Sequence, residues 1–218
     1  MYNPVIFDLD GTLLNTLGDL ADAGNYALQS AGYPTHPEER FKTFVGNGIP
    51  NLIRRMLPEN ASDSESERVH TLFSEYYAAH KADRTAPYDG ITELLTELKS
   101  RGITILCNTN KQHKYSEQLI RDYFGELITE LCADSGRFPR KPSPEAAVYL
   151  AEKYFKDGCK PLYVGDSSVD MQTAKNAGFD VCGVLWGFRS KEELSQYNPT
   201  FLAENAAQLR TFIIGEGD

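Results

Sequence analysis

Two aspartates, Asp8 and Asp10, stand one residue apart directly after a short apolar run, residues 5–7. Charged side chains at the end of an apolar strand are not explained by packing, and two carboxylates this close repel each other. A cation held between them would relieve that repulsion. Gly11 follows at once, and a residue without a Cβ suits a tight turn or a close approach of the backbone to a ligand. The stretch therefore predicts a chemical site where the first strand ends.

Polar residues follow two later apolar runs in the same way. Thr109 comes after residues 103–107, and Asp166 comes after residues 162–164. Ligands of open parallel sheets bind beyond the carboxyl ends of the strands, so folding would gather these two residues and Asp8 along one edge. A cluster of carboxylate oxygens suits a hard cation such as Mg²⁺, which keeps several waters and takes a few carboxylates together with substrate phosphate.

The elements that must position these residues are short strands alternating with helices. The predicted strands are 5–7, 103–107, 127–132, 162–164 and 181–185, and the predicted helices between them are 91–100, 116–124 and 143–155. Such alternation indicates an α/β fold, a doubly wound parallel sheet with helices on both faces and a Rossmann-like core.

A long insertion separates the first strand from the rest and has a different pattern. Apolar residues recur there at helical spacing, and the predicted helices cover 17–31, 52–57 and 69–77. We therefore expect a small all-helical cap domain over residues 16–83, with its apolar stripes forming its own core. The core domain would then comprise residues 1–15 and 84–218.

Composition excludes several classes of function. The 218-residue chain has a net charge of −9, which argues against broad nucleic-acid binding, because that needs a basic face. No apolar run approaches the ~18 residues of a membrane span, and no targeting segment is evident, so we expect a cytoplasmic protein without a membrane partner. The four cysteines and four histidines show neither disulfide nor zinc spacing. An acidic enzyme that acts on anions would need cations of its own at the site.

The run Asp8-Leu9-Asp10-Gly11-Thr12 resembles the first motif of the haloacid dehalogenase-like hydrolases, most of which are Mg²⁺-dependent phosphatases. The family's other motifs follow in order as Asn108-Thr109-Asn110-Lys111, Lys141-Pro142-Ser143-Pro144 and Gly165-Asp166-Ser167-Ser168-Val169-Asp170. Residues 45–48 with Arg55, and residues 186–190, resemble the phosphoglycolate phosphatase-like branch. Asn15 is a departure, since Asp is common there; its position lies outside the metal and phosphate motifs.

The resemblance implies a division of catalytic work. Asp8 would be the nucleophile that forms an aspartyl-phosphate, and Asp10 would protonate the leaving alkoxide and later take a proton from water. Lys141 would neutralise phosphoryl oxygens together with the metal, because a carboxylate approaching a phosphate dianion meets like charge. The remaining contacts to the substrate are expected from Thr109 and from the backbone around Leu9, Gly11 and Asn110.

The resemblance also assigns the metal. The ligands of Mg²⁺ would be the Asp8 side chain, the Asp10 backbone carbonyl and Asp166. Asp170, one helical turn later, would support the metal ligands without binding the metal itself. An equally good alternative is that Asp170 is an acid stabilised by the positive end of a helix. Thr12 is expected to hydrogen-bond locally and steady the turn.

Four other residues are open to two interpretations each. In the cap, Asn47 and Arg55 would bind a small anionic substrate; alternatively, the glycines around Asn47 end a helix and Arg55 faces water. Lys111 is a second phosphate contact or a solvated loop charge, and we favour the solvated charge. Arg189 reaches the site or merely caps its own segment.

We expect a phosphatase of a small phosphorylated metabolite, with 2-phosphoglycolate as the first candidate. A pyrophosphatase, a sugar phosphatase or a phosphomutase keeps the same motifs and stays open. A dehalogenase is disfavoured, because Asp10 would have no alkoxide to protonate. A non-catalytic phospho-acceptor module is the alternative from another class, and both a monomer and a homodimer remain open.

Overall fold

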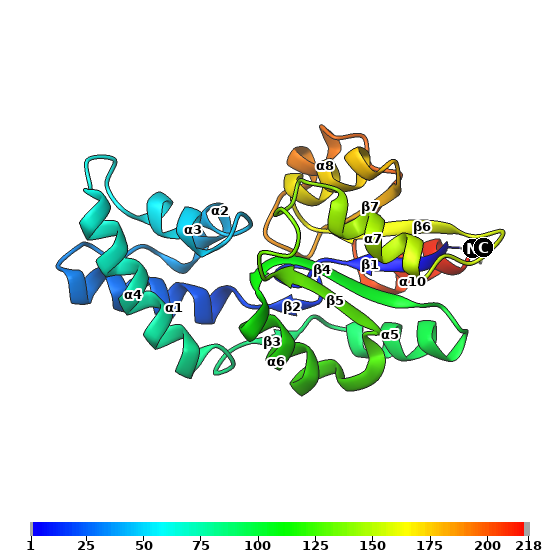
Figure 1. The fold of residues 1–218 in the computed structure, drawn as a ribbon, viewed down its shortest axis with the longest axis horizontal. Coiled ribbons are helices and arrows are strands. Elements are labelled where there is room, and N and C mark those ends of the chain that lie inside the picture. Colours follow the sequence, from blue (N-terminus) through cyan, green and yellow to red (C-terminus); the bar gives the residue numbers. More distant parts are fainter. Residues whose placement is uncertain (1, 216–218) are drawn as a thin grey trace. The chain divides into compact units, whose positions relative to one another are not determined.

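The computed structural model describes residues 2–215. Its main sheet has six parallel strands in the order β5-β4-β1-β6-β7-β8 (Figure 1). The strands are β1 Tyr2–Phe7, β4 Ile105–Gln112, β5 Glu130–Asp134, β6 Lys160–Gly165, β7 Asp180–Val184 and β8 Phe201–Ala203. From β1 the chain builds β4 and β5 on one side, and then crosses over to β6 on the other side. The predicted doubly wound α/β fold is confirmed.

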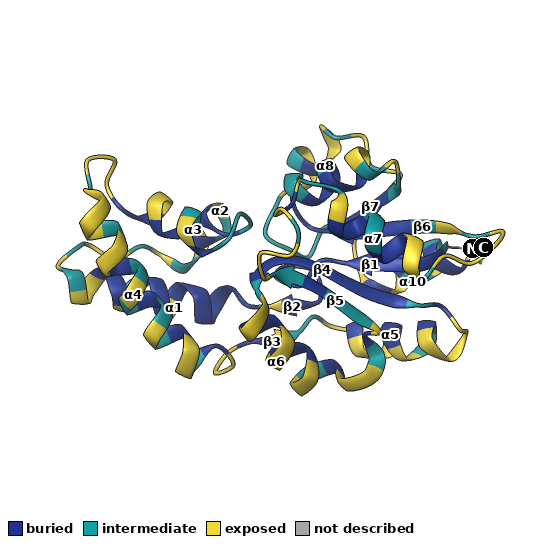
Figure 2. Cartoon of the chain, viewed as in Figure 1, coloured by how far each residue is buried: buried dark blue, intermediate teal, exposed yellow. Residues whose placement is uncertain are grey.

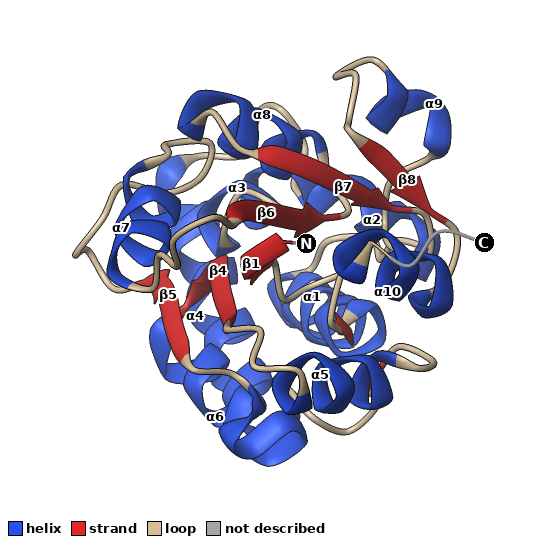
Figure 3. Ribbon diagram, turned by 90° about the vertical axis from the view of Figure 1, so that its right-hand side faces the viewer, coloured by secondary structure: helices blue, strands red, loops and turns tan. Residues whose placement is uncertain are grey.

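Helices cover both faces of this sheet (Figure 3). One face packs against α5 Ile91–Ser100, α6 His113–Phe124 and α10 Ala206–Ile214, and the other packs against α7 Glu145–Lys153, α8 Ser168–Ala177 and α9 Lys191–Ser195. Strands β1, β4, β6 and β7 are buried along most of their length, whereas the outward helix faces are exposed (Figure 2). Within residues 2–215, no helix is long and apolar enough to cross a membrane.

Several element boundaries differ from the prediction. Strand β4 continues through Lys111 to Gln112, although polar residues replace the apolar run after Cys107. Strand β5 begins only at Glu130, because Gly125–Leu127 forms a short 3₁₀ turn. The three-residue strand β8 is too short to give a period in the sequence.

The chain divides into two compact units. The core unit is Met1–Leu14 with Pro87–Asp218, and the cap unit is Asn15–Ala86. The cap unit contains α1 Leu17–Ala31, α2 Glu38–Phe44, α3 Ile49–Met56 and α4 Asp63–His80. The short strands β2 Leu14–Asn15 and β3 Ala86–Pro87, where the chain passes between the units, pair with each other.

Helix α2 was not foreseen, because its charged residues dilute the apolar pattern. Its Phe41 is fully buried against α1, and a Cβ on Gly24 would lie 2.3 Å from the Phe41 ring. Asp19 ties α1 to the end of the cap unit. Its carboxylate, 1% exposed, accepts hydrogen bonds from the Arg84 amide and from the Thr85 amide and hydroxyl, at 2.6–2.9 Å.

Candidate active site

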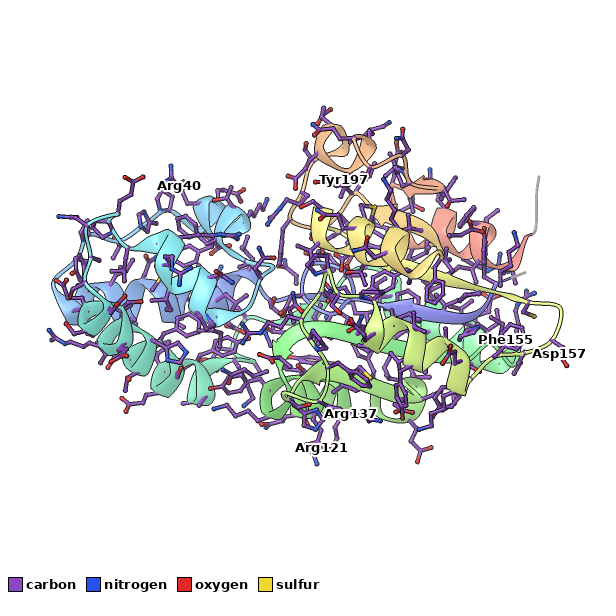
Figure 4. All side chains as sticks on the ribbon, turned by 45° about the horizontal axis from the view of Figure 1, so that its top comes forward. Arg40, Arg121, Arg137, Phe155, Asp157 and Tyr197 are labelled. Atoms are coloured by element: carbon purple, nitrogen blue, oxygen red, sulfur yellow. The ribbon has the colours of Figure 1, made fainter. Side chains whose placement is uncertain are left out.

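The sheet register brings three predicted site residues to one edge. Phe7 on β1 pairs with Cys107 on β4 and Val164 on β6. Asp8 and Asp166 therefore follow the ends of neighbouring strands, and Thr109 lies close to the same level within β4. All three are buried, with at most 7% of their surface exposed. Figure 4 shows Phe155 and Asp157, in the connection from α7 into β6, at the opposite edge of the sheet.

Lys141 lies between two of the buried acids. Its Nζ is 2.8 Å from Asp8 Oδ1 and 2.7 Å from Asp170 Oδ1, and its side chain is 3% exposed. Asn110 holds the Lys141 backbone from both sides: Asn110 Nδ2 donates to Lys141 O at 3.1 Å, and Lys141 N donates to Asn110 Oδ1 at 2.8 Å. This side-chain clamp was missed from the sequence, where Asn110 was considered only for its backbone.

Asp170 lies at the start of α8, as one of its two interpretations predicts, and it also contacts Lys141; its support of a metal stays a prediction. One oxygen, Oδ1, pairs with Lys141, while Oδ2 accepts hydrogen bonds from the Ser167 amide and hydroxyl at 3.1 and 2.6 Å. Together with the Ser167 hydroxyl, which accepts from the Asp170 amide, these bonds form a capping box at the start of α8. The helix start therefore aims Asp170 at Lys141.

Both oxygens of Asp166 are also held. Thr12 Oγ1 donates to Oδ1 at 3.2 Å, and the amide of Phe188 donates to Oδ2 at 2.7 Å. The Thr12 hydroxyl thus reaches across to another strand end instead of making the local bond expected for it. The Phe188 contact was missed from the sequence, because a backbone donor carries no residue signature.

Two glycines allow the backbone to approach Asp166. A Cβ on Gly11 would lie 2.3 Å from Asp166 Oδ2, and a Cβ on Gly187 would lie 2.3 Å from Asp166 Cβ. Gly11 also adopts a φ of 85°, which favours glycine, and its amide donates to Leu14 O at 2.9 Å. The predicted close approach at Gly11 is therefore made to Asp166.

Leu9 shapes the same turn. It is fully buried, and its carbonyl accepts backbone hydrogen bonds from Thr12, Leu13 and Leu14 at 3.0–3.3 Å.

The buried carboxylates repel one another. Burial, repulsion from Asp170 and a weaker effect of Asp10 raise the pKa of Asp8 to about 7, against the attraction of Lys141. Burial, followed by repulsion from Asp170 and Asp8, raises the pKa of Asp166 to about 8. Such repulsion is what a bound cation would remove.

The residues present fit a divalent cation. Asp8, Asp166 and Asp170 each offer a carboxylate oxygen within 4.8 Å of the others, and all three are buried. Asp8 Oδ1 lies 2.8 Å from Lys141 Nζ, and this is its one ion pair with the described residues. An all-oxygen set of this kind suits a hard cation.

The interpretation favoured for Lys111 from the sequence is wrong. Lys111 is not a solvated loop charge: its side chain is 4% exposed, and its Nζ lies 2.9 and 3.2 Å from the two oxygens of Asp10. The reason is the extension of β4, which carries Lys111 within the sheet. Its amide donates to Thr109 Oγ1 at 3.2 Å, which links it to the phosphate motif.

Arg189 pairs within its own segment, and its charge also affects Asp166. Its Nε lies 3.4 Å from Glu193 Oε1 within its own segment, and its charge lowers the pKa of Asp166, against the larger effect of burial.

In the cap unit, Arg55 binds the loop between α2 and α3. Its Nη1 donates to the carbonyls of Phe44 and Thr43 at 3.0 and 3.4 Å, and Asn47, with its amide turned to satisfy both neighbours, accepts from Nη2 at 2.9 Å. Arg55 is exposed but does more than face water, since these bonds fix the loop that carries Asn47.

The sequence model of the haloacid dehalogenase-like hydrolases matches residues 5–184. The chain belongs to this family. The match covers all four acids of the site and both of its buried lysines, so the family assignment and the site concern the same residues.

Relatives within the family match nearly the whole chain. A phosphoglycolate phosphatase of Vibrio parahaemolyticus is 35% identical over 212 residues, 94% of this chain and 93% of the relative. One from Haemophilus influenzae is 32% identical over 95% of this chain and 96% of its own. A solved structure from Lactobacillus delbrueckii subsp. bulgaricus, an inferred phosphoglycolate phosphatase, has a TM-score of 0.91 at 30% identity and covers 97% of this chain and 98% of its own.

Proposed function

We propose that this hydrolase is a Mg²⁺-dependent phosphatase of small phosphate monoesters, with 2-phosphoglycolate as its first candidate substrate. The observation that carries the proposal is the buried Asp8 carboxylate, in contact with Lys141 and beside Asp166. The relatives named phosphoglycolate phosphatase support the substrate. We further propose that the core unit is the hydrolase domain and the cap unit its cap domain.

In the first half of the reaction, Asp8 attacks phosphorus and the ester bond to the leaving oxygen breaks. Lys141, 2.8 Å from Asp8 Oδ1, offsets the repulsion between the carboxylate and the phosphate dianion. Asp10 gives its proton to the leaving alkoxide. The product on the protein is an aspartyl-phosphate.

In the second half, water attacks the phosphorus of the aspartyl-phosphate and gives a proton to Asp10. The bond between phosphorus and the Asp8 oxygen breaks, which restores the Asp8 carboxylate and releases inorganic phosphate. The hydroxyl of Thr109 and the backbone near it hold the phosphoryl oxygens, because positioning dominates phosphoryl transfer. Asp8, Asp166 and the Asp10 carbonyl would hold Mg²⁺, with Asp170 in support. Bound Mg²⁺ supplies positive charge to the phosphoryl oxygens.

The test is phosphate release with Mg²⁺ across 2-phosphoglycolate, sugar phosphates, other phosphate esters and pyrophosphate. Asp8→Asn and chelated protein serve as controls. Preference for 2-phosphoglycolate that both controls abolish supports the proposal. Preference for another ester or for pyrophosphate keeps the chemistry and rejects the substrate, and a long-lived phosphorylated protein without turnover rejects the enzyme. The cytoplasmic location, the oligomeric state and the substrate contacts of Asn47 and Arg55 stay predictions.

A further inference from the structure

The site holds two buried lysines with different neighbours. Among the described residues of the core unit, Lys111 and Lys141 are the lysines that are buried, with 4% and 3% of their side chains exposed. Burying an ammonium group costs free energy unless it is paired. Lys141 lies among the nucleophile and the acids of the proposed metal site, so the position of Lys111 calls for a separate explanation.

Lys111 lies on the leaving-group side of the reaction centre. A general acid must come within ~2.6–3.2 Å of the atom that it protonates, and Asp10 is the proposed acid. The Nζ of Lys111 is 2.9 Å from Asp10 Oδ1. The ammonium therefore stands close to the point where the leaving oxygen departs, while Lys141 contacts Asp8 at the attacking side.

A substrate anion at Lys111 would share the ammonium with the two oxygens of Asp10. An ammonium has three N–H donors, and Lys141 shows within this site that one ammonium can contact two carboxylates, those of Asp8 and Asp170. In a phosphorylated two-carbon hydroxy acid, the carboxylate carbon is two bonds from the leaving oxygen. Its carboxylate therefore falls near the proton donor and within reach of Lys111.

We propose that Lys111 binds the carboxylate of a short phosphorylated hydroxy acid and selects this class over esters with neutral leaving groups. The inference rests on the proposed phosphatase function and deepens it. It places part of the substrate selection in the core unit, on a side chain that the strand extension of β4 holds in position. The charge of Lys111 offsets part of the three negative charges of such a substrate in a chain whose net charge is −9.

The test compares two matched esters, 2-phosphoglycolate and 2-hydroxyethyl phosphate, which differ by a carboxylate against a neutral hydroxymethyl group. Lys111→Met should lower kcat/KM for 2-phosphoglycolate about 10- to 100-fold more than for 2-hydroxyethyl phosphate, as expected for loss of one charged hydrogen bond. Most of that difference should be in KM. Lys111→Arg, which keeps the charge, should lose less. Lys114→Met removes an exposed lysine nearby on α6 and should leave the preference unchanged.

Equal losses for the two esters in Lys111→Met would overturn the inference, because Lys111 would then serve only Asp10. A second measurement does not need turnover: calorimetric binding of both esters to Asp8→Asn, with and without Lys111→Met. Tighter binding of 2-phosphoglycolate that depends on Lys111 supports the inference, and its absence overturns it. A wild-type protein that hydrolyses neither ester rejects the proposed function, and this binding measurement then decides the inference alone.

Discussion

The core and cap units place their polar side chains in different ways. In the core unit, buried carboxylates and lysines contact one another across strand ends, as Lys141 does with Asp8 and Asp170. In the cap unit, Arg55 is exposed and donates hydrogen bonds to two carbonyls at the end of α2. The sheet brings together side chains that are far apart in sequence, whereas the hydrogen bonds of Arg55 hold only a nearby segment of the cap unit. We therefore expect chemistry to depend on the core contacts, and the cap contacts to affect binding more modestly.

A buried lysine in each unit gives the strongest test of this difference. Lys141→Met should lower kcat about 10³-fold or more, because the charge beside the nucleophile is lost. Lys81, 9% exposed in the cap unit, donates to the Ala78 carbonyl at 3.1 Å. Lys81→Met should reduce kcat far less. Steady-state kinetics on both variants, with melting temperatures to confirm folding, would contradict the comparison if the losses were similar.

Asn110→Ala tests whether position, and not charge alone, matters in the core unit. The variant keeps Lys141 but loses both hydrogen bonds to its backbone. A misplacement of about 1 Å can cost ~10²-fold in rate, so we expect kcat to fall about 10²-fold. Asn176→Ala is the matched control, since Asn176 donates one exposed hydrogen bond to Pro142 in the same loop. If the two variants show equal kcat, the clamp has no catalytic role.

Gly187→Ala tests the support of Asp166. The added Cβ would lie 2.3 Å from Asp166 Cβ and 2.5 Å from the Gly11 carbonyl, so the carboxylate must shift. Outer contacts to metal ligands are worth about 10–100-fold in metal affinity, and we expect a loss of that size for Mg²⁺ by calorimetry. Phe188→Ala keeps the amide that donates to Asp166 and should bind Mg²⁺ nearly as well. Unchanged affinity in Gly187→Ala would show that Asp166 is not a ligand.

The raised pKa of Asp166 predicts a pH effect on the metal-free protein. Burial raises this pKa from 3.8 to about 8, so between these values the folded state binds more protons than the unfolded state. Rising pH in that window then favours unfolding. Without metal, Asp166→Asn should gain stability over wild type from pH 4 to pH 8, by more than the ~2–4 °C that corresponds to about 1 kcal/mol. Mg²⁺ at pH 8 should reverse the order, and parallel melting curves would contradict the assignment.

The smallest effect is expected in the cap unit. Arg55→Ala removes hydrogen bonds to the Phe44 and Thr43 carbonyls and loosens the loop that carries Asn47. We expect KM to rise by no more than about tenfold, as for loss of a few exposed hydrogen bonds, with kcat nearly unchanged. Lys42→Ala, which removes an exposed ion pair with Glu39 in α2, is the control. A large fall in kcat for Arg55→Ala would contradict the division between the units.

The sequence predicted best where a strand end defines a position. Asp8 and Asp166 each follow a buried strand, so the doubly wound pattern alone places them at one edge. The environment of Lys111 could not be predicted in this way, because polar residues hide the continuation of β4. The contacts of Phe188 and of the Asn110 amide depend on tertiary register, which leaves no local pattern. Helix α2 was not predicted, because its charged residues obscure the helical spacing of the apolar residues Phe41 and Phe44.

The pairing of β2 with β3 determines how easily the inserted segment could be replaced. The cap unit leaves the core unit at Leu14–Asn15 and returns at Ala86–Pro87, and these two short strands are neighbours. An inserted segment whose ends meet can be exchanged or shortened without stretching the host chain. Asp19 accepts hydrogen bonds from Arg84 and Thr85, which connects the end of the inserted segment to α1 near its beginning. The two ends of the segment are therefore held together by contacts within the segment. The same sheet can thus accept other insertions at this junction, and a short turn from Leu14 to Pro87 would leave the strand order of the main sheet unchanged.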